Sequence, residues 1–165
     1  MTKDNPQTHP WRRRRNRLDL EAYRGADAFA VTAVTWQRAR VFADAGEVGL
    51  CRGALFANAQ EHGFQVLVYC FMPDHLHLLV EGSDDSNLVR FMKAFKQATS
   101  FEYKRRTGHR LWQPSYYDHI VRGPEDLEAS IDYILANPVQ AGLTDDPYAY
   151  EFSGGAVLEA EAVAT

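Results

Sequence analysis

Residues 64–82, "FQVLVYCFMPDHLHLLVEG", limit the possible folds of this chain more than any other stretch. They form two apolar runs joined by Pro73 and Asp74, and apolar runs of this length bounded by turn residues predict β-strands. A two-residue connection allows only antiparallel pairing, so residues 64–72 and 75–82 are predicted to form a hairpin. Because both strands are rich in large apolar side chains, we expect this hairpin to lie near the centre of the fold.

The second strand of the hairpin alternates between two kinds of side chain. Successive residues of a strand point to opposite faces of a sheet, so the imidazoles of His75 and His77 share one face. Leu76 and Leu78 share the other face, which can pack into a core. Imidazole nitrogens, in contrast, need hydrogen-bond partners or a metal ion. On these residues alone, a metal-binding pair and a hydrogen-bonded structural pair are both open.

The remainder of the chain reads as alternating strands and helices. The predicted elements are strand 28–36, helix 47–63, strands 64–72 and 75–82, helix 85–108, strand 116–121 and helix 123–142. The first six follow the βαββαβ order of a ferredoxin-like fold, an α+β architecture with an antiparallel sheet and helices on one face. We expect the other face to be exposed, with the histidine pair near its centre and the C-terminal helix added to this plan.

Length and composition are those of one soluble domain. A chain of 165 residues can bury its own core, and we expect a basic arm (1–24), a central domain (25–143) and an acidic tail (144–165). Cys51 and Cys70 both lie in apolar segments, which argues against a disulfide framework and for a reducing compartment. The apolar runs are shorter than the roughly 18 residues of a membrane span, so we expect a cytoplasmic protein without a membrane partner.

The net charge of −4 hides a strong segregation of charge. Residues 1–123 hold 18 Lys and Arg against 13 Asp and Glu, a net charge of +5, whereas residues 124–165 hold 9 acids and no Lys or Arg. The basic part is typical of proteins that bind nucleic acid, and we expect the acidic end to be solvated. A solubilising leader and a solvated helix face are the alternatives. The predicted DNA-contacting cations belong to the arm and to helix 85–108: Arg12, Arg13, Arg14, Arg15, Arg90, Lys93, Lys96, Lys104, Arg105 and Arg106.

The C-terminal helix carries a tyrosine and an asparagine at helical spacing. Tyr133 and Asn137 are four residues apart and therefore share one face. An amide oxygen at Asn137 could complete a three-ligand, open metal site with the two imidazoles. A phenol beside a Lewis-acidic cation is a plausible nucleophile. Tyr116 and Tyr117 are explained by aromatic packing, while His119 could either approach the site or bond Asp118.

Three segments in this order and spacing, "MPDHLHLL", "LWQPSYYDHIVR" and "SIDYILANPVQAGL", carry a family resemblance. They resemble the single-tyrosine transposases of the HUH (His-hydrophobe-His) endonuclease superfamily, and most closely the REP-associated tyrosine transposase branch. The resemblance runs from about Ala28 to Leu143. After Leu143 the chain departs from the pattern, because it is acidic where basic DNA-contacting sequence is expected.

The resemblance implies both a metal site and a reaction. It implies that His75, His77 and Asn137 hold a divalent ion, Mg²⁺ or Mn²⁺, and Mn²⁺ tolerates mixed nitrogen and oxygen ligands better than Mg²⁺ does. It also implies that Tyr133 attacks a phosphate of single-stranded DNA, which leaves a 5′-phosphotyrosine and a free 3′-hydroxyl. The implied partner is single-stranded DNA with hairpin-forming repeats, bound at the nucleoid by a monomer or homodimer.

Two other functions stay open on the sequence. The first is a domesticated, non-cleaving nucleic-acid-binding protein on the same scaffold, although a binder has no need of the complete set of candidate site residues. The second is a metal-dependent hydrolase that uses water, which would need a general base near the metal. Asp74 and Asp132 are the nearby acids, and no motif supports either in that role.

Overall fold

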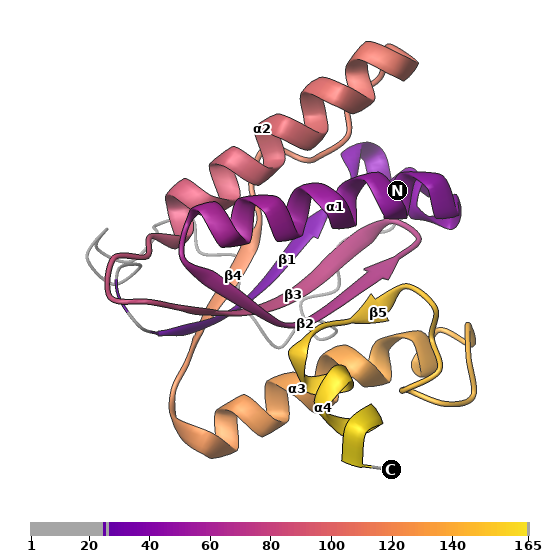
Figure 1. Ribbon diagram of the computed structural model, residues 1–165. Coiled ribbons are helices and arrows are strands. Elements are labelled where there is room, and N and C mark those ends of the chain that lie inside the picture. The colour runs from indigo at the N-terminus through magenta and orange to yellow at the C-terminus, as the bar shows by residue number, and fades with distance from the viewer. Residues whose placement is uncertain (1–24, 26, 165) are drawn as a thin grey trace.

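The computed structural model describes residue 25 and residues 27–164, and it has the α+β architecture that the sequence predicts (Figure 1). The two short 3₁₀ turns Trp36–Arg38 and Val41–Ala43 precede the first long helix. The main elements are β1 (Ala28–Val34), α1 (Ala45–Glu61), β2 (Phe64–Met72), β3 (His75–Gly82), α2 (Leu88–Thr107), β4 (Tyr117–Val121), α3 (Gly123–Gln140), β5 (Ser153–Gly154) and α4 (Ala156–Ala164). The predicted βαββαβ order is confirmed, and a fifth strand and a fourth helix extend it.

The five strands form one sheet in the order β4-β1-β3-β2-β5, and every neighbouring pair is antiparallel. The predicted hairpin is confirmed as β2 and β3, with Met72 opposite His75. β3 is the middle strand, and it pairs with β1 on its other side, where Thr32 lies opposite His77. The histidine strand therefore lies at the centre of the sheet, as its apolar sequence indicated.

Helices cover both faces of the sheet. α1 and α2 lie side by side on one face (Figure 1), where Leu76 and Leu78 are buried in the larger core. The prediction of an exposed second face is wrong, because α3 and α4 lie over it. Leu79 and its neighbours on that face are fully buried against Ile134 of α3. An uncovered face would have left this apolar surface in water.

Local sequence signals explain where several elements begin and end. The Asn87 side chain accepts a hydrogen bond from the Arg90 amide and caps the start of α2, and Gly108 ends that helix at a φ of +77°. β1 is shorter than predicted because the chain turns sharply after Thr35, with Gln37 and Arg38 both at a φ of +53°. These terminal signals fix the directions in which the chain leaves the sheet.

The C-terminal segment packs onto the sheet, so the prediction of a solvated end is wrong for this part of the chain. β5 pairs with β2, and the Tyr150 hydroxyl donates a hydrogen bond to the Phe71 carbonyl at 2.9 Å. Val157 and Leu158 pack against the second core. The segment thus covers part of an edge that β2 would otherwise expose. Among the described residues, no helix combines the length and apolarity needed to cross a membrane.

The packing predicts which leucines the fold depends on. Leu78 is fully buried at the centre of the larger core, so Leu78→Ala should lower the free energy of unfolding by about 2–5 kcal/mol. Leu50 on α1 is 52% exposed, and Leu50→Ala should change stability by no more than about 0.5 kcal/mol. Urea unfolding of the two variants checks both values, and equal losses would contradict the described packing.

Candidate active site

The two histidines of β3 converge on each other. The Nε2 atoms of His75 and His77 are 3.0 Å apart, and the two rings are nearly perpendicular with centroids 4.6 Å apart. His77 is only 1% exposed, so the expectation that it lies on an open face is wrong. His75 remains partly exposed at the end of the strand. The pair therefore has a buried member and a member near the surface.

The outer ring nitrogens have partners of their own. His77 Nδ1 lies 2.9 Å from the Thr32 hydroxyl, and His75 Nδ1 lies 2.6 Å from Asp74 Oδ1. A carboxylate only accepts hydrogen bonds, so neutral His75 carries its proton on Nδ1 and turns the lone pair of Nε2 inward. The Thr32 hydroxyl can donate or accept, and it therefore allows either tautomer of His77. Without a metal, His77 can donate from Nε2 to the lone pair of His75 Nε2, and the other tautomer of His77 would present a second lone pair to a cation at the same point.

Asp74 is itself held in place. Arg38 Nη1 lies 3.3 Å from Asp74 Oδ2, and the Asp74 carbonyl accepts a hydrogen bond from the Thr35 amide at 3.0 Å. The hydrogen bond with His75 lowers the pKa of Asp74, and the charge of Arg38 acts in the same direction. Asp74 is therefore an anion at neutral pH. Arg38 was not among the predicted site residues, and nothing in its local sequence marks it, because its reach to Asp74 depends on the turn after β1.

α3 brings Tyr133 against the histidine pair. The Tyr133 ring meets His77 edge-on, with centroids 5.5 Å apart at 81°. Asn137 lies one turn further along, and its Nδ2 donates to the Tyr133 carbonyl at 2.8 Å. Burial raises the pKa of Tyr133, and a side-chain hydrogen bond with Asn137 partly offsets this. Tyr133 is thus a protonated phenol at neutral pH, half-buried beside the imidazole that the spacing predicted it would approach.

The donor atoms fit a divalent cation. Two nitrogens that each lie about 2.1 Å from a metal at a right angle are about 3.0 Å apart, which matches the separation of the two Nε2 atoms. Among the described residues, no group of three His, Cys, Asp or Glu could complete such a site. Within the described part of the chain, a third protein ligand would therefore be a neutral oxygen, and the Asn137 amide, one turn from Tyr133 on α3, is the candidate that the sequence predicts.

Other candidate residues fall into different surroundings. Tyr116 packs on the α1–α2 side, where Lys96 Nζ lies 5.9 Å from its ring centroid. Tyr117 lies opposite Thr32, whose side chain reaches His77, so Tyr117 is on the same face as the histidines. His119 bonds both carboxylate oxygens of Asp126 on α3, at 2.8 and 2.9 Å. The predicted alternative that His119 bonds Asp118 is therefore wrong.

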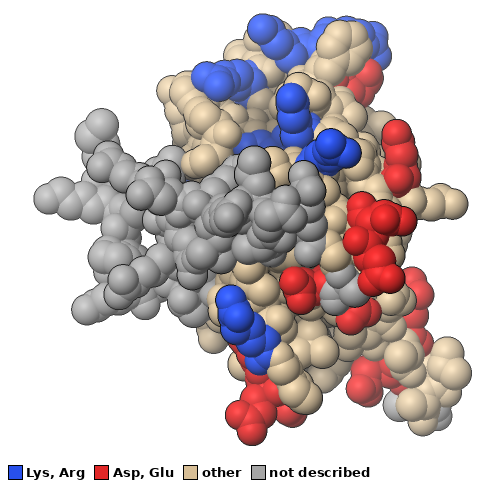
Figure 2. All heavy atoms as spheres, turned by 90° about the vertical axis from the view of Figure 1, so that its left-hand side faces the viewer, with Lys and Arg blue, Asp and Glu red and all other residues tan. Residues whose placement is uncertain are grey.

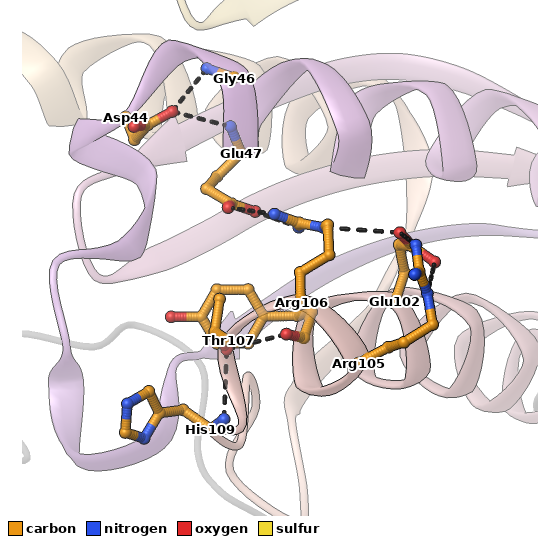
Figure 3. Close-up of polar contacts among 9 residues, drawn as sticks. Asp44, Gly46, Glu47, Glu102, Arg105, Arg106, Thr107 and His109 are labelled. Carbon is orange, nitrogen blue, oxygen red and sulfur yellow. Dashed lines mark hydrogen bonds and ion pairs between the residues drawn. The ribbon is translucent and has the colours of Figure 1, made fainter.

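The predicted DNA-contacting cations differ in how they are paired. Arg12–Arg15 lie outside the described residues. Figure 3 shows Arg106 of α2 reaching Glu47 of α1 with both terminal nitrogens, each at 2.8 Å, and Arg105 paired with Glu102 at 2.6 Å. These two arginines are thus neutralised within the fold. Lys96 donates to the main-chain carbonyl of Gln113. The remaining cations of the set make no ion pair with a described carboxylate: Arg90, Lys93 and Lys104.

The face of the molecule drawn in Figure 2 shows the same division of charge. In Figure 2, Lys and Arg side chains gather mainly at the height of α2, while Asp and Glu gather mainly below them, towards the side of α3 and α4. A polyanion would therefore meet attractive potential beside α2 and repulsion on the outer surface of α3 and α4.

The fold and the surroundings of the histidine pair can now be compared with those of known proteins. Residues 28–137 match the family described as "Transposase IS200 like". The match covers well over half of the chain, and the chain belongs to the IS200-like transposase family.

Individual proteins that resemble this chain belong to one group of transposases. The chain is 28% identical over 109 residues to a REP-associated tyrosine transposase of Escherichia coli (strain K12), which covers 63% of the chain and 62% of that protein. A Haemophilus influenzae protein assigned to the same group is 30% identical over 107 residues, with 57% and 60% covered. The match thus spans about three fifths of the length of these relatives. A solved REP-associated tyrosine transposase bound to a REP hairpin superposes with a TM-score of 0.68 at 20% identity, over 79% of this chain and 78% of that one.

The role of Asp74 in orienting His75 is testable in the metal-free protein. In the wild type, ¹⁵N NMR of the imidazoles should show neutral His75 protonated on Nδ1, because Asp74 accepts that proton at 2.6 Å. Asp74→Ala should remove this tautomer preference. Asp132 is exposed on α3, and Asp132→Ala makes the same change of charge while leaving the His75 signals unchanged. An unaltered His75 tautomer in Asp74→Ala would show that the carboxylate does not orient the ring.

Proposed function

We propose that this protein is a metal-dependent DNA transposase that cleaves and rejoins single strands with Tyr133 as its nucleophile. The observation that carries this proposal is the placement of the Tyr133 ring edge-on to His77, whose Nε2 is 3.0 Å from that of His75. A metal site alone would serve many reactions, but a half-buried phenol directly beside it indicates covalent chemistry. Membership of the IS200-like transposase family supports the same conclusion.

The residues of the site have distinct tasks in this proposal. His75, His77 and Asn137 would hold the divalent ion, which supplies polarisation of the phosphate when bound. Asp74 orients the ring of His75, while Thr32 fixes that of His77. α3 excludes water from His77 and holds the phenol at the edge of its ring. The ligand set of two imidazoles and one amide favours Mn²⁺ over Mg²⁺ in vitro.

The reaction exchanges one phosphate ester for another. The Tyr133 oxygen attacks the phosphorus and its proton passes to water; the bond from phosphorus to the 3′-oxygen breaks, and that oxygen leaves as a 3′-hydroxyl after taking up a proton. The 5′-phosphotyrosine retains the energy of the original diester. Attack by a 3′-hydroxyl on the phosphotyrosine then restores a DNA diester and frees Tyr133, so strand transfer needs no nucleotide cofactor.

The proposed substrate is single-stranded DNA that forms hairpins from short repeats. One protein with the same fold is solved bound to a REP hairpin, and the basic surface beside α2 suits a polyanion. We place this activity on the DNA of the nucleoid, in the cytoplasm. A water-based hydrolase is less well supported, because both carboxylate oxygens of Asp74, the acid nearest the histidines, are already bonded to His75 and Arg38.

The proposal predicts a covalent intermediate that depends on a single oxygen atom. Tyr133→Phe keeps the ring and its packing, so metal and DNA binding should survive. With labelled single-stranded DNA and Mn²⁺, denaturing electrophoresis should show no protein–DNA adduct and no 3′-hydroxyl product for this variant. Tyr117→Phe is the matched control on the same face of the sheet, and it should still form the adduct.

Two results would contradict the assignment of Tyr133. An adduct of Tyr133→Phe that maps by peptide mass to Tyr117 would move the nucleophile to β4. Nicking by Tyr133→Phe without any adduct would mean that water attacks the phosphate, as in the hydrolase alternative. A shift of the DNA under native conditions only, with wild-type protein, would favour the non-cleaving binder.

Substitution of a metal ligand is predicted to lower metal affinity, whereas substitution of a residue with only a structural hydrogen bond should not. Asn137→Ala should abolish the adduct and lower Mn²⁺ affinity in calorimetry by at least 10-fold. Asn58 makes the same type of bond on α1, from its Nδ2 to the Ala54 carbonyl at 2.7 Å, and Asn58→Ala should leave both properties unchanged. Equal Mn²⁺ affinities in the two variants would remove Asn137 from the ligand set.

The two histidines should behave differently when each is truncated. His75→Ala should lose Mn²⁺ binding with little change in stability, because this ring lies near the surface. His77→Ala should lose Mn²⁺ binding and also about 1–3 kcal/mol of stability in urea unfolding, since it leaves the buried Thr32 hydroxyl without its partner. Full activity of both variants would show that the site lies elsewhere.

A further inference from the structure

A basic groove lies at the flank of α2, on the other side of β1 from the histidines. Its volume is about 280 Å³, and it is formed by the second half of α2 and the segment that leads towards β4. The lining combines an apolar floor with cations, and among the described residues no carboxylate contributes to it. The residues that matter are Lys96, Lys104, Arg110, Trp112 and Gln113.

Two cations of this groove are exposed, and one of them packs on an aromatic ring. The Arg110 guanidinium stacks on the Trp36 ring, 4.2 Å from its centroid. Neither Arg110 nor Lys104 makes an ion pair with a described carboxylate. Arg105 and Arg106, on the same end of α2, are instead occupied by Glu102 and Glu47 (Figure 3). Around the end of α2, Arg105 and Arg106 are thus paired with carboxylates, whereas Lys104 and Arg110 are exposed and make no ion pair with a described carboxylate.

The groove opens at the same end of the sheet as the candidate active site. Val34, at the end of β1, pairs with His75 on one side and accepts a hydrogen bond from the Gln113 amide at 2.9 Å on the other. With strands about 4.8 Å apart, the backbones of His75 and Gln113 are about 10 Å from each other. Lys96 fixes the Gln113 segment by donating to its carbonyl at 2.7 Å. The groove and the candidate active site are therefore connected through the backbone at the end of β1.

The short distance between the groove and the candidate active site suggests a role for the groove, and this role rests on the proposed function. We propose that the groove binds the backbone of the single strand that flanks the scissile phosphate, with Lys104 and Arg110 each contacting a phosphate. A few nucleotides of single strand are enough to cross a span of about 10 Å. The contacts are to phosphates, so the groove positions the strand without reading its sequence.

The groove assignment can be tested by comparing the DNA affinities of two double variants, one of unpaired cations and one of paired cations. The groove variant is Lys104→Gln with Arg110→Gln, and the control is Arg105→Gln with Arg106→Gln, which removes the same charge. Both are made in the full-length Tyr133→Phe chain, and affinity for a labelled single-stranded oligonucleotide is measured by fluorescence anisotropy in EDTA. At about 0.15 M salt the Debye length is about 8 Å, so local contacts dominate.

The groove variant should bind at least 10-fold more weakly than its parent, and its slope of log affinity against log salt should be shallower by about 1.4, or about 0.7 for each lost phosphate contact. The control should change affinity less than 3-fold and keep the parental slope. A photoreactive base placed within a few nucleotides of the cleaved bond should crosslink to the peptide that contains Gln113. Equal losses in both variants, or parental affinity and slope in the groove variant, would overturn the assignment.

This test and the test of the proposed function can fail separately. Binding is measured without metal and without the Tyr133 hydroxyl, so it does not depend on cleavage. If wild-type protein forms no adduct while the groove variant still loses affinity selectively, the groove stands and the transposase proposal fails. If the adduct forms while the groove variant binds like its parent, the transposase proposal stands and the groove assignment fails. Thermal unfolding of both variants confirms that each is folded, as expected for exposed side chains.

Discussion

Burial of the His77 imidazole at the centre of the sheet is the constraint on which the rest of the site depends. An imidazole that is 1% exposed needs hydrogen bonds at both nitrogens, and Thr32 and His75 provide them. Thr32 can do so only in the observed pairing of β1 with β3. A slip of one residue would turn the leucines of β3 towards α3 and both histidines into the larger core. The same pairing thus secures the core and assembles the donors.

Covering this face with α3 has a chemical consequence. The helix buries Leu79 and His77 together, so the contact that stabilises the second core also holds the Tyr133 ring at the edge of the imidazole. Burial raises the pKa of Tyr133 and keeps it protonated at neutral pH, so a resting protein carries no reactive phenolate. In the proposed reaction, Tyr133 would become a strong nucleophile only beside a bound cation and phosphate, which would limit unwanted attack on other groups.

The turn after β1 is strained, and this strained turn supports the orientation of His75. Gln37 and Arg38 both adopt positive φ values of +53°, a conformation that costs roughly 1–2 kcal/mol per residue for side chains other than glycine. This conformation brings Arg38 into contact with Asp74, and Asp74 in turn orients the ring of His75. Local strain that supports a functional group is typical of active sites.

The parts of the fold that could be predicted are those that local pattern determines. The β2–β3 hairpin follows from two apolar runs and a two-residue connection, and the spacing of Tyr133 and Asn137 places them on one side of α3. The covered second face could not be predicted in the same way, because it depends on Ile134 meeting Leu79, far away in the sequence. β5 is only two residues long and has no strand pattern to detect. Pairing of Arg106 with Glu47 joins residues 59 positions apart, so the sequence could show the charges but not which of them are already neutralised.

The distribution of charge then determines how a polyanion can approach a site that lies under an acidic layer. Residues 124–165, which form α3, β5 and α4, hold 9 acids and no Lys or Arg, so the outer surface of that layer repels DNA. The cations lie mainly at the height of α2 (Figure 2), beyond the other face of the sheet. The two environments meet at the end of β1, where His75, Arg38 and the segment of Gln113 surround the last residues of the strand. A single strand can bend around such an end and pass from one face of the sheet to the other, whereas a stiff duplex cannot. If Tyr133 acts on DNA as proposed, the same division of charge that gives the chain its small net charge would favour a single-stranded substrate there.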